Sequence, residues 1–145
     1  MIKVYPYLAG DIYLIKPKEI YKEDHTLEER HEWMHEKGAA YLYTCFNDDD
    51  AIAIIGGALL WPGVMDVFTV TSELVKECKL AFHKTIVTMI KDITHHEKLY
   101  RMQMVVRENF DEGCKWAECL GFKREALLEK YGPDRKNYYM YARLR

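Results

Sequence analysis

The chain has 145 residues, of which 49% are apolar and 13% aromatic, enough for one domain with a buried core. Its formal charge is −2, and its 21 basic and 23 acidic side chains are interspersed, which favours neither a nucleic-acid nor a membrane partner. The longest apolar run, residues 51–61, is shorter than the roughly 20 residues that cross a bilayer. We therefore expect a single domain over residues 1–145.

The cysteines are scattered along the chain and form no C-x-x-C pair. They are Cys45, Cys78, Cys114 and Cys119. This spacing indicates buried or half-buried free thiols in a reducing compartment rather than a disulfide or a metal site. The N-terminus also lacks the basic, apolar and small-residue pattern of a secretory signal, so we expect a cytoplasmic protein.

The N-terminal part of the chain predicts one strand followed by a helical region. Ile2–Leu8 has the composition of a strand, and residues 10–22 favour one or two short helical turns. His25–Lys37 is charged and helix-prone, with Asp24 as a suitable cap and Gly38 as a suitable stop.

Three strands are expected next. Ala39–Phe46 and Ala51–Leu60 are joined by a polar turn at residues 47–50, which is a hairpin signal. Val64–Thr71 follows a Trp-Pro-Gly turn and predicts the third strand.

After residue 71 the spacing between apolar residues changes to three or four positions. Apolar side chains recur at Val75, Cys78, Phe82, Ile86, Ile90 and Ile93. This spacing predicts an amphipathic helix of about five turns.

The last third of the chain predicts a strand, a helix and two more strands. Tyr100–Val106 is the strand, and Asn109 can cap the helix, with Glu112 completing a capping box and Gly121 near the helix end. The final strands are Phe122–Lys130 and Asn137–Leu144. A three-strand meander followed by a strand–helix–strand unit predicts an α/β protein with a mixed sheet and helices on both faces.

At this point the sequence resembles the GNAT superfamily of acetyl-CoA-dependent N-acetyltransferases, most strongly over residues 64–144. The residues that carry the resemblance are the Val70-Thr71-Ser72 turn, Asn109, Leu120-Gly121-Phe122 and the final Tyr139–Leu144 strand. Within the superfamily the sequence resembles small acetyltransferase-like proteins of bacteriophages, which share the Val-Thr-Ser turn and a following helix without glycines. The resemblance implies a mostly antiparallel sheet of six to seven strands.

The resemblance also implies a reaction. An amine of the acceptor, which is a small molecule or a protein, attacks the thioester of acetyl-CoA directly. Backbone N–H groups on the strand ending at Val70 bind the thioester oxygen, and Asn109 bonds to the cofactor. Asp66 or Glu73 near the central strand is the natural base for the amine, and Asp66 shares its strand face with apolar neighbours. Two-fold dimers are common for such folds.

The cofactor site departs from the family pattern. A helix N-terminus beside splayed strands suits a pyrophosphate, and the family reaches it with a glycine-rich loop. This chain has no glycine between Gly63 and Gly113, and residues 78–83 stand at the position of the loop. Ala81 and His83 occupy the two glycine places.

Lysines near the same helix offer a second way to hold phosphates. Lys76, Lys79 and Lys84 can bind them by charge where glycine is absent. The alternative is that these lysines form the solvated face of an amphipathic helix.

A further departure concerns the general acid. The family often places a tyrosine four residues before the glycine of Leu-Gly-Phe, and here that position is Ala117, beside Trp116. Together with the missing glycines, this leaves open a non-catalytic protein of the same fold. Such a protein would bind a partner or build a structure, for example in a phage virion or against a host protein.

A competing motif lies in the N-terminal helical region. His31-Glu32-Trp33-Met34-His35 matches H-E-x-x-H, which on a helix can hold zinc with the glutamate as base. Its flanks are charged, and Tyr41 stands where a third histidine would be needed, so a zinc metallopeptidase is a remote alternative and we expect no metal. In a GNAT-like fold the region borders the acceptor side, where Glu32 and His35 would shape the acceptor pocket.

Overall fold

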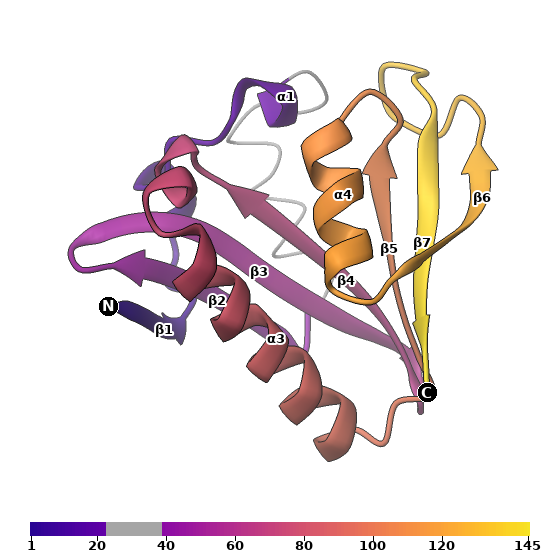
Figure 1. The fold of residues 1–145 in the computed structure, drawn as a ribbon, viewed down its shortest axis with the longest axis horizontal. Helices are drawn as coiled ribbons and strands as arrows, with labels where there is room; N and C mark the ends of the chain where they lie inside the picture. The colour runs from indigo at the N-terminus through magenta and orange to yellow at the C-terminus, as the bar shows by residue number, and fades with distance from the viewer. Residues whose placement is uncertain (23–38) are drawn as a thin grey trace.

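A seven-stranded sheet in the order β1-β2-β3-β4-β5-β7-β6 forms the centre of the computed structural model, which describes residues 1–22 and 39–145 (Figure 1). The strands are β1 Ile2–Pro6, β2 Tyr41–Asn47, β3 Asp50–Trp61, β4 Val64–Thr71, β5 Arg101–Arg107, β6 Lys123–Leu128 and β7 Tyr138–Leu144. Within the described chain, β4 and β5 are the one parallel pair of neighbours. The mixed, mostly antiparallel sheet expected from the sequence is confirmed.

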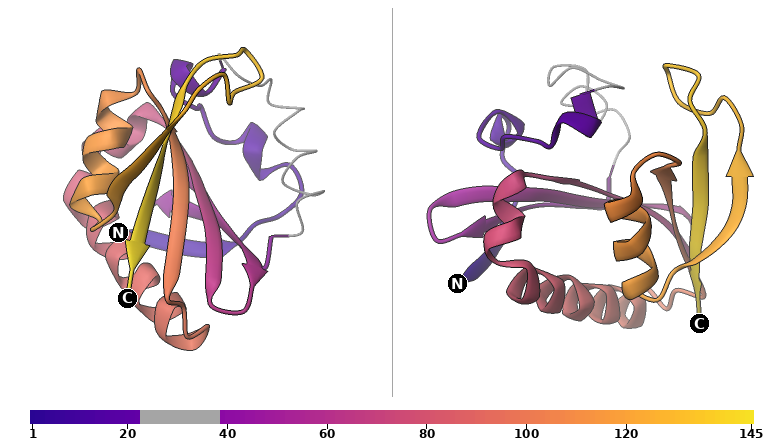
Figure 2. Two further views of the ribbon diagram at one scale, coloured as in Figure 1. Left: turned by 90° about the vertical axis from the view of Figure 1, so that its right-hand side faces the viewer. Right: turned by 45° about the horizontal axis from the view of Figure 1, so that its top comes forward.

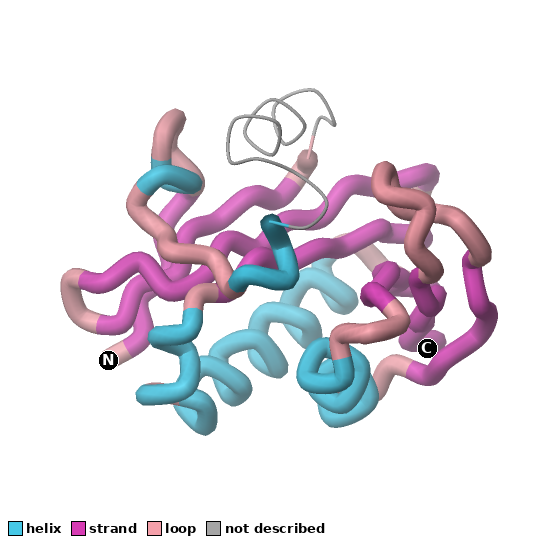
Figure 3. The backbone as a smooth tube through the Cα atoms, turned by 90° about the horizontal axis from the view of Figure 1, so that it is seen from above, coloured by secondary structure: helices cyan, strands magenta, loops and turns pink. Residues whose placement is uncertain are grey.

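Helices cover both faces of this sheet, as expected. They are the 3-10 helices η1 Asp11–Tyr13 and η2 Glu73–Glu77 and the α-helices α1 Glu19–Lys22, α3 Lys79–His96 and α4 Asp111–Cys119. Helices α3 and α4 lie on one face, and the N-terminal segment with η1 and α1 crosses the other (Figures 2 and 3). The helix expected at His25–Lys37 lies outside the described residues.

Two apolar clusters hold these layers together. The larger lies between the sheet and helices α3 and α4, and the smaller is formed by Ile12, Ile15 and Ile54 under the N-terminal segment. Strand β4 contributes to both because its side chains alternate between the faces: Met65 packs in the large cluster and Phe68 against the small one.

The helix after β4 begins later than the sequence period predicts. Ser72 Oγ accepts a hydrogen bond from the Leu74 amide at 3.1 Å and starts η2 instead. Cys78 then leaves the helical region, with φ −140° and ψ 32°, before α3 begins at Lys79. Val75 and Lys76 therefore lie on a separate 3-10 helix. Because α3 begins anew at Lys79, its N-terminus lies near the end of β4.

The predicted cap of α4 is wrong. The N-cap position is Phe110, without a side-chain cap hydrogen bond, and Asn109 Oδ1 instead accepts from Arg107 Nε at 3.3 Å. Glu112 pairs with Lys18 on a distant segment instead of turning back to cap the helix. A long-range ion pair has replaced the local capping box.

The Leu-Gly-Phe sequence ends α4 through backbone geometry. The Gly121 amide donates to the Glu118 carbonyl at 3.0 Å and the Phe122 amide to the Ala117 carbonyl at 3.0 Å, which is a Schellman motif. Gly121 has φ 91°, a left-handed conformation that side chains disfavour. Ala117 and Phe122 are both buried in the large cluster, so the motif directs the chain from helix to core.

All four cysteines are free thiols, as expected. Cys45 and Cys114 are buried and Cys78 is half-buried, but Cys119 is exposed, so for that residue the expected burial is wrong. Burial raises the pKa of the Cys45 thiol to about 12. Of the helices in residues 1–22 and 39–145, none combines the length and apolar character needed to cross a membrane.

We expect Gly121→Ala to lower the free energy of unfolding by about 1–2 kcal/mol, because a Cβ is disfavoured at this φ. An added Cβ would meet Arg143 Nε at 3.4 Å, an ordinary contact, so the cost is conformational rather than steric. Urea denaturation measures it. Gly121→Asn is the matched control and should cost less, since asparagine tolerates left-handed backbone; equal losses would contradict this explanation.

Candidate functional site

The candidate site arises where β4 and β5 part. The two strands pair only at Val64↔Arg101, Met65↔Met102 and Asp66↔Gln103. Beyond these residues β4 continues along β3 and β5 continues along β7, so the two strands diverge toward their ends (Figure 1). The edge of β4 that faces β5 is therefore left without a neighbouring strand beyond residue 67.

The sheet register determines which backbone groups face this opening. The Ser72 amide donates to the Ile52 carbonyl at 2.8 Å, and Val70 is paired with Ile54 in the same register. Since hydrogen bonding alternates along an antiparallel strand, Val70 presents its amide to β3. The amides of Val67, Thr69 and Thr71 point the other way, toward β5. The Val67 amide is used by the last parallel pair, Asp66↔Gln103, so the amides of Thr69 and Thr71 are the ones that face the opening.

Val70 was expected among the cofactor-binding residues, and it does line the cleft. It is only 3% exposed, however, and the backbone amides available to a ligand belong to its neighbours. The distinction between odd and even residues follows from strand pairing, which the sequence of β4 alone does not specify.

The opening forms a cleft of about 830 Å³, within the usual range for a small-molecule site. Its walls come from four regions: the end of β4, the first turn of α3, one side of α4 with β5, and the segments that carry α1 and the β6–β7 loop. Expected site residues that line it are Asp66, Val70, Lys76, Lys79 and His83. Within the described chain, Glu73, Ala81, Lys84 and Asn109 do not line it.

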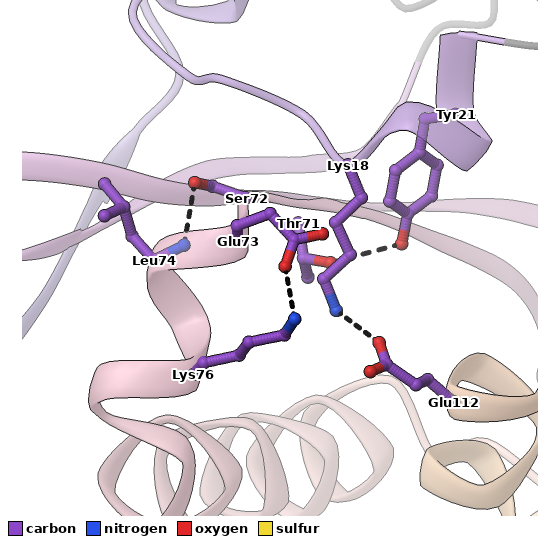
Figure 4. Close-up of polar contacts among 8 residues, drawn as sticks. All are labelled: Lys18, Tyr21, Thr71, Ser72, Glu73, Leu74, Lys76 and Glu112. Carbon is purple, nitrogen blue, oxygen red and sulfur yellow. Dashed lines mark hydrogen bonds and ion pairs between the residues drawn. The ribbon is translucent and has the colours of Figure 1, made fainter.

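The two expected bases occupy different positions. Asp66 is half-buried in the cleft at the last residue pair before β4 and β5 separate. Glu73 lies outside the cleft lining of the described chain and pairs with Lys76 at 2.6 Å, and both side chains are more than half exposed (Figure 4). The geometry favours Asp66 as the group that meets a ligand.

His83 and Trp116 connect the two helices across the cleft wall. Trp116 Nε1 donates to His83 Nδ1 at 3.3 Å, and the indole stacks on Phe82 with ring centroids 5.6 Å apart. Because Nδ1 accepts this bond, the neutral imidazole carries its proton on Nε2. Trp116 was noted in the sequence only as the neighbour of Ala117, and its pairing with His83 carried no sequence signal.

Ala117, at the place of the usual tyrosine, is fully buried beneath α4. Its methyl group packs in the core, so this position supplies no proton donor to the cleft. The departure that the sequence indicated is therefore present in the structure.

The N-terminal segment is fastened across the end of the cleft. Lys18 Nζ pairs with Glu112 at 2.9 Å, and the Lys18 amide donates to the Thr71 carbonyl at 3.0 Å. Tyr21 OH lies 3.3 Å from Thr71 Oγ1, so side chain and backbone both hold the segment to β4 (Figure 4). Lys18 is only 13% exposed. It lies 94 residues from Glu112, which explains why sequence reasoning missed the pair.

The β6–β7 loop forms the opposite side of the cleft mouth. Tyr131, Pro133 and Tyr138 line the cleft there. The guanidinium of Arg107, 5% exposed, anchors this loop through an ion pair with Asp134 at 3.1 Å.

Glu32 and His35, expected on the acceptor side, lie outside the described residues, as does the whole H-E-x-x-H motif. The acceptor-side interpretation and the zinc alternative therefore stay predictions.

We expect Lys18→Met to destabilise the protein by about 0.5 kcal/mol at neutral pH, a small effect because Glu112 is partly solvated. The hydrogen bond from Lys18 lowers the pKa of Glu112 below its ordinary 4.5. Stability from a lowered carboxyl pKa is present above the ordinary value and is lost as the pH falls through the lowered one.

Urea denaturation of the wild type and Lys18→Met should thus differ at pH 7 and converge in acid. Lys18→Arg, which keeps the charge, is the control. A difference between wild type and Lys18→Met that persists after Glu112 is protonated would contradict the ion-pair explanation.

No protein-family model matches the sequence, and no curated protein matches it. Solved structures do match. A GNAT-family acetyltransferase from Bacillus anthracis has 14% identity and a TM-score of 0.76 over 99% of this chain and 94% of that chain. Ard1 from Thermoplasma volcanium has 14% identity and a TM-score of 0.78 over 99% and 97%.

RimL, a ribosomal L7/L12 alpha-N-protein acetyltransferase solved in complex with coenzyme A, has 13% identity and a TM-score of 0.75 over 99% of this chain and 93% of that chain. Identities this low show the fold alone. The chain therefore has the fold of the GNAT acetyltransferases over nearly its whole length.

Proposed function

We propose that the protein is an N-acetyltransferase that moves an acetyl group from acetyl-CoA to an amine by direct attack. The observation that supports this most is the opening between β4 and β5 beside the N-terminus of α3. It combines an unpaired strand edge, which an extended pantetheine arm can follow, with a helix terminus suited to phosphate.

The first turn of α3 is the proposed pyrophosphate site. The amides of Lys79, Leu80 and Ala81 have no acceptor within the helix, because they precede its first turn of hydrogen bonds. Lys76 and Lys79 line the cleft beside them; Lys79 adds positive charge, while the charge of Lys76 is balanced by its ion pair with Glu73. His83, with its N–H on Nε2, replaces a glycine backbone contact by a side-chain donor.

The pantetheine arm is proposed to lie along the open edge of β4. There the Thr69 amide can donate to a carbonyl group of the arm or to the thioester oxygen, as an amide of a neighbouring strand would. This donor is fixed by the β3–β4 pairing before any ligand arrives, which favours stabilisation of charge that develops on the oxygen.

Asp66 is the proposed base. It takes the proton from the acceptor amine, the amine nitrogen bonds to the thioester carbon, and the carbon–sulfur bond breaks. The thiolate leaves and is protonated by water, because Ala117 offers no acid. The acceptor is proposed to enter past Tyr21 and the β6–β7 loop, and is a small-molecule or protein amine.

One observation favours a second function. Ala117 is buried and supplies no general acid, and the Trp116–His83 hydrogen bond occupies the wall of the proposed cofactor site. Both differences from the family pattern are expected if the fold is retained for binding alone. In that case the protein is a non-catalytic partner-binding protein, such as a phage component, and it would bind coenzyme A weakly or transfer nothing.

Thermal melting with acetyl-CoA tests the cofactor site. A ligand at a hundred times its dissociation constant should stabilise the fold by about 2.7 kcal/mol. Lys79→Glu, which places a negative charge beside the phosphates, should weaken binding by about tenfold or more.

Lys84→Glu is the matched control: it makes the same charge change on the same helix, at an exposed position outside the described cleft lining. Absence of any shift at millimolar acetyl-CoA would reject the proposed function. Equal weakening by both variants would reject the phosphate site.

Turnover at saturating acetyl-CoA tests the base. Asp66→Asn should lower kcat by about a hundredfold or more while the cofactor still binds, since general base catalysis contributes on the order of 10²–10⁴. Glu73→Gln should keep most of the rate, because Glu73 is engaged by Lys76 and does not line the described cleft. The reverse result would make Glu73 the base.

A further inference from the structure

A second, smaller cavity of about 80 Å³ lies between α3 and the sheet. Its wall is apolar and includes Met65, Ile86, Ile90, Met102, Leu120 and Phe122. It shares Val67, Thr69, Met104 and Trp116 with the cleft, so the two spaces adjoin at the point where β4 and β5 part.

Thr69 stands at this junction with an unsatisfied hydroxyl. Its Oγ1 is buried and has no hydrogen-bond partner, a condition that among the described residues only Thr94 Oγ1 shares. Thr94 is near the end of α3 and lines neither described space. Since a buried hydroxyl without a partner is costly, Thr69 is a place where a ligand acceptor atom is expected.

Strand alternation gives the direction of this hydroxyl. Thr69 is on the same side of β4 as Met65 and Val67, which pack in the cluster beneath α3. The side chain therefore faces the small cavity, while the Thr69 amide faces the opening. Thr69 therefore offers two donors where the cavity and the cleft adjoin.

We propose that this cavity is an acyl-chain pocket, so that the same site prefers a short-chain acyl thioester longer than acetyl as its donor, with Thr69 Oγ1 donating to the carbonyl oxygen. This inference rests on the proposed function. An apolar cavity of about 150 Å³ takes a benzene molecule, so about half that volume takes roughly three carbons beyond the carbonyl, as in butyryl.

The chemistry of the wall restricts the chain further. The side chains that enclose the cavity are apolar except for hydroxyl groups and the indole N–H of Trp116, which donates to His83, and no charged side chain occurs among its described lining. A terminal carboxylate, as in a succinyl group, would be buried there without a partner. The pocket thus fits an uncharged hydrocarbon chain.

Binding of three thioesters tests the proposal: acetyl-, butyryl- and succinyl-CoA, each titrated by thermal melting. Butyryl-CoA should bind about tenfold more tightly than acetyl-CoA, since each buried methylene tightens binding by a few-fold. Succinyl-CoA, of the same length but charged, should gain nothing over acetyl-CoA.

Two variants locate the effect. Ile90→Phe fills the cavity and should abolish the advantage of butyryl-CoA over acetyl-CoA, whereas Ile90→Leu should preserve it. Thr69→Val removes the hydroxyl while keeping a side chain of nearly the same size. The free protein should therefore melt no lower than the wild type, whereas all three thioesters should bind more weakly.

The outcomes separate the two proposals. If acetyl-CoA binds as tightly as butyryl-CoA, or if the folded Ile90→Phe variant keeps the preference, the acyl pocket is rejected and the acetyltransferase proposal stands. If no thioester binds, both are rejected. A lowered melting temperature of free Thr69→Val would show that the hydroxyl has a structural partner, and would also overturn the role given to it.

Discussion

The pairing of β5 with β7 is the constraint on which the rest of the site depends. β5 bonds to β7 along its whole length, from Arg101↔Leu144 to Arg107↔Tyr138, but to β4 at only three residue pairs. A strand cannot follow two diverging neighbours, so the edge of β4 opens. The cleft, its free amides and its contact with the first turn of α3 all follow from this one division of hydrogen bonds.

Much of the fold was predictable because it depends on short-range patterns in the sequence, such as the spacing of apolar residues. The alternation of β2 to β4, the three-to-four-residue period of α3 and the Leu120-Gly121-Phe122 helix end each depend on a few neighbouring residues. The absence of glycine between Gly63 and Gly113 could also be read directly from the sequence. These features were enough to predict a GNAT-like sheet without the family's glycine-rich loop.

The site itself was only partly predictable, since it depends on contacts between distant segments. The break at Cys78, which moves Lys76 off the long helix, follows from the Ser72 cap and not from the apolar period, which continues through it. Lys18–Glu112 and Trp116–His83 are tertiary pairs without a spacing rule. Lys79 and Lys84 are the same residue type on the same helix. They differ only in the direction in which they project from α3, which places Lys79 in the cleft lining and Lys84 outside it.

The parting of β4 and β5 also has a topological consequence. The cleft is lined by Phe82 and Trp116 from the helical layer and by Ile20 and Tyr21 from the N-terminal layer, so it runs through the sheet and connects its two faces. Two ligands can enter such a passage from opposite ends and meet in the middle. In the proposed acyl transfer, neither ligand would have to leave for the other to exchange.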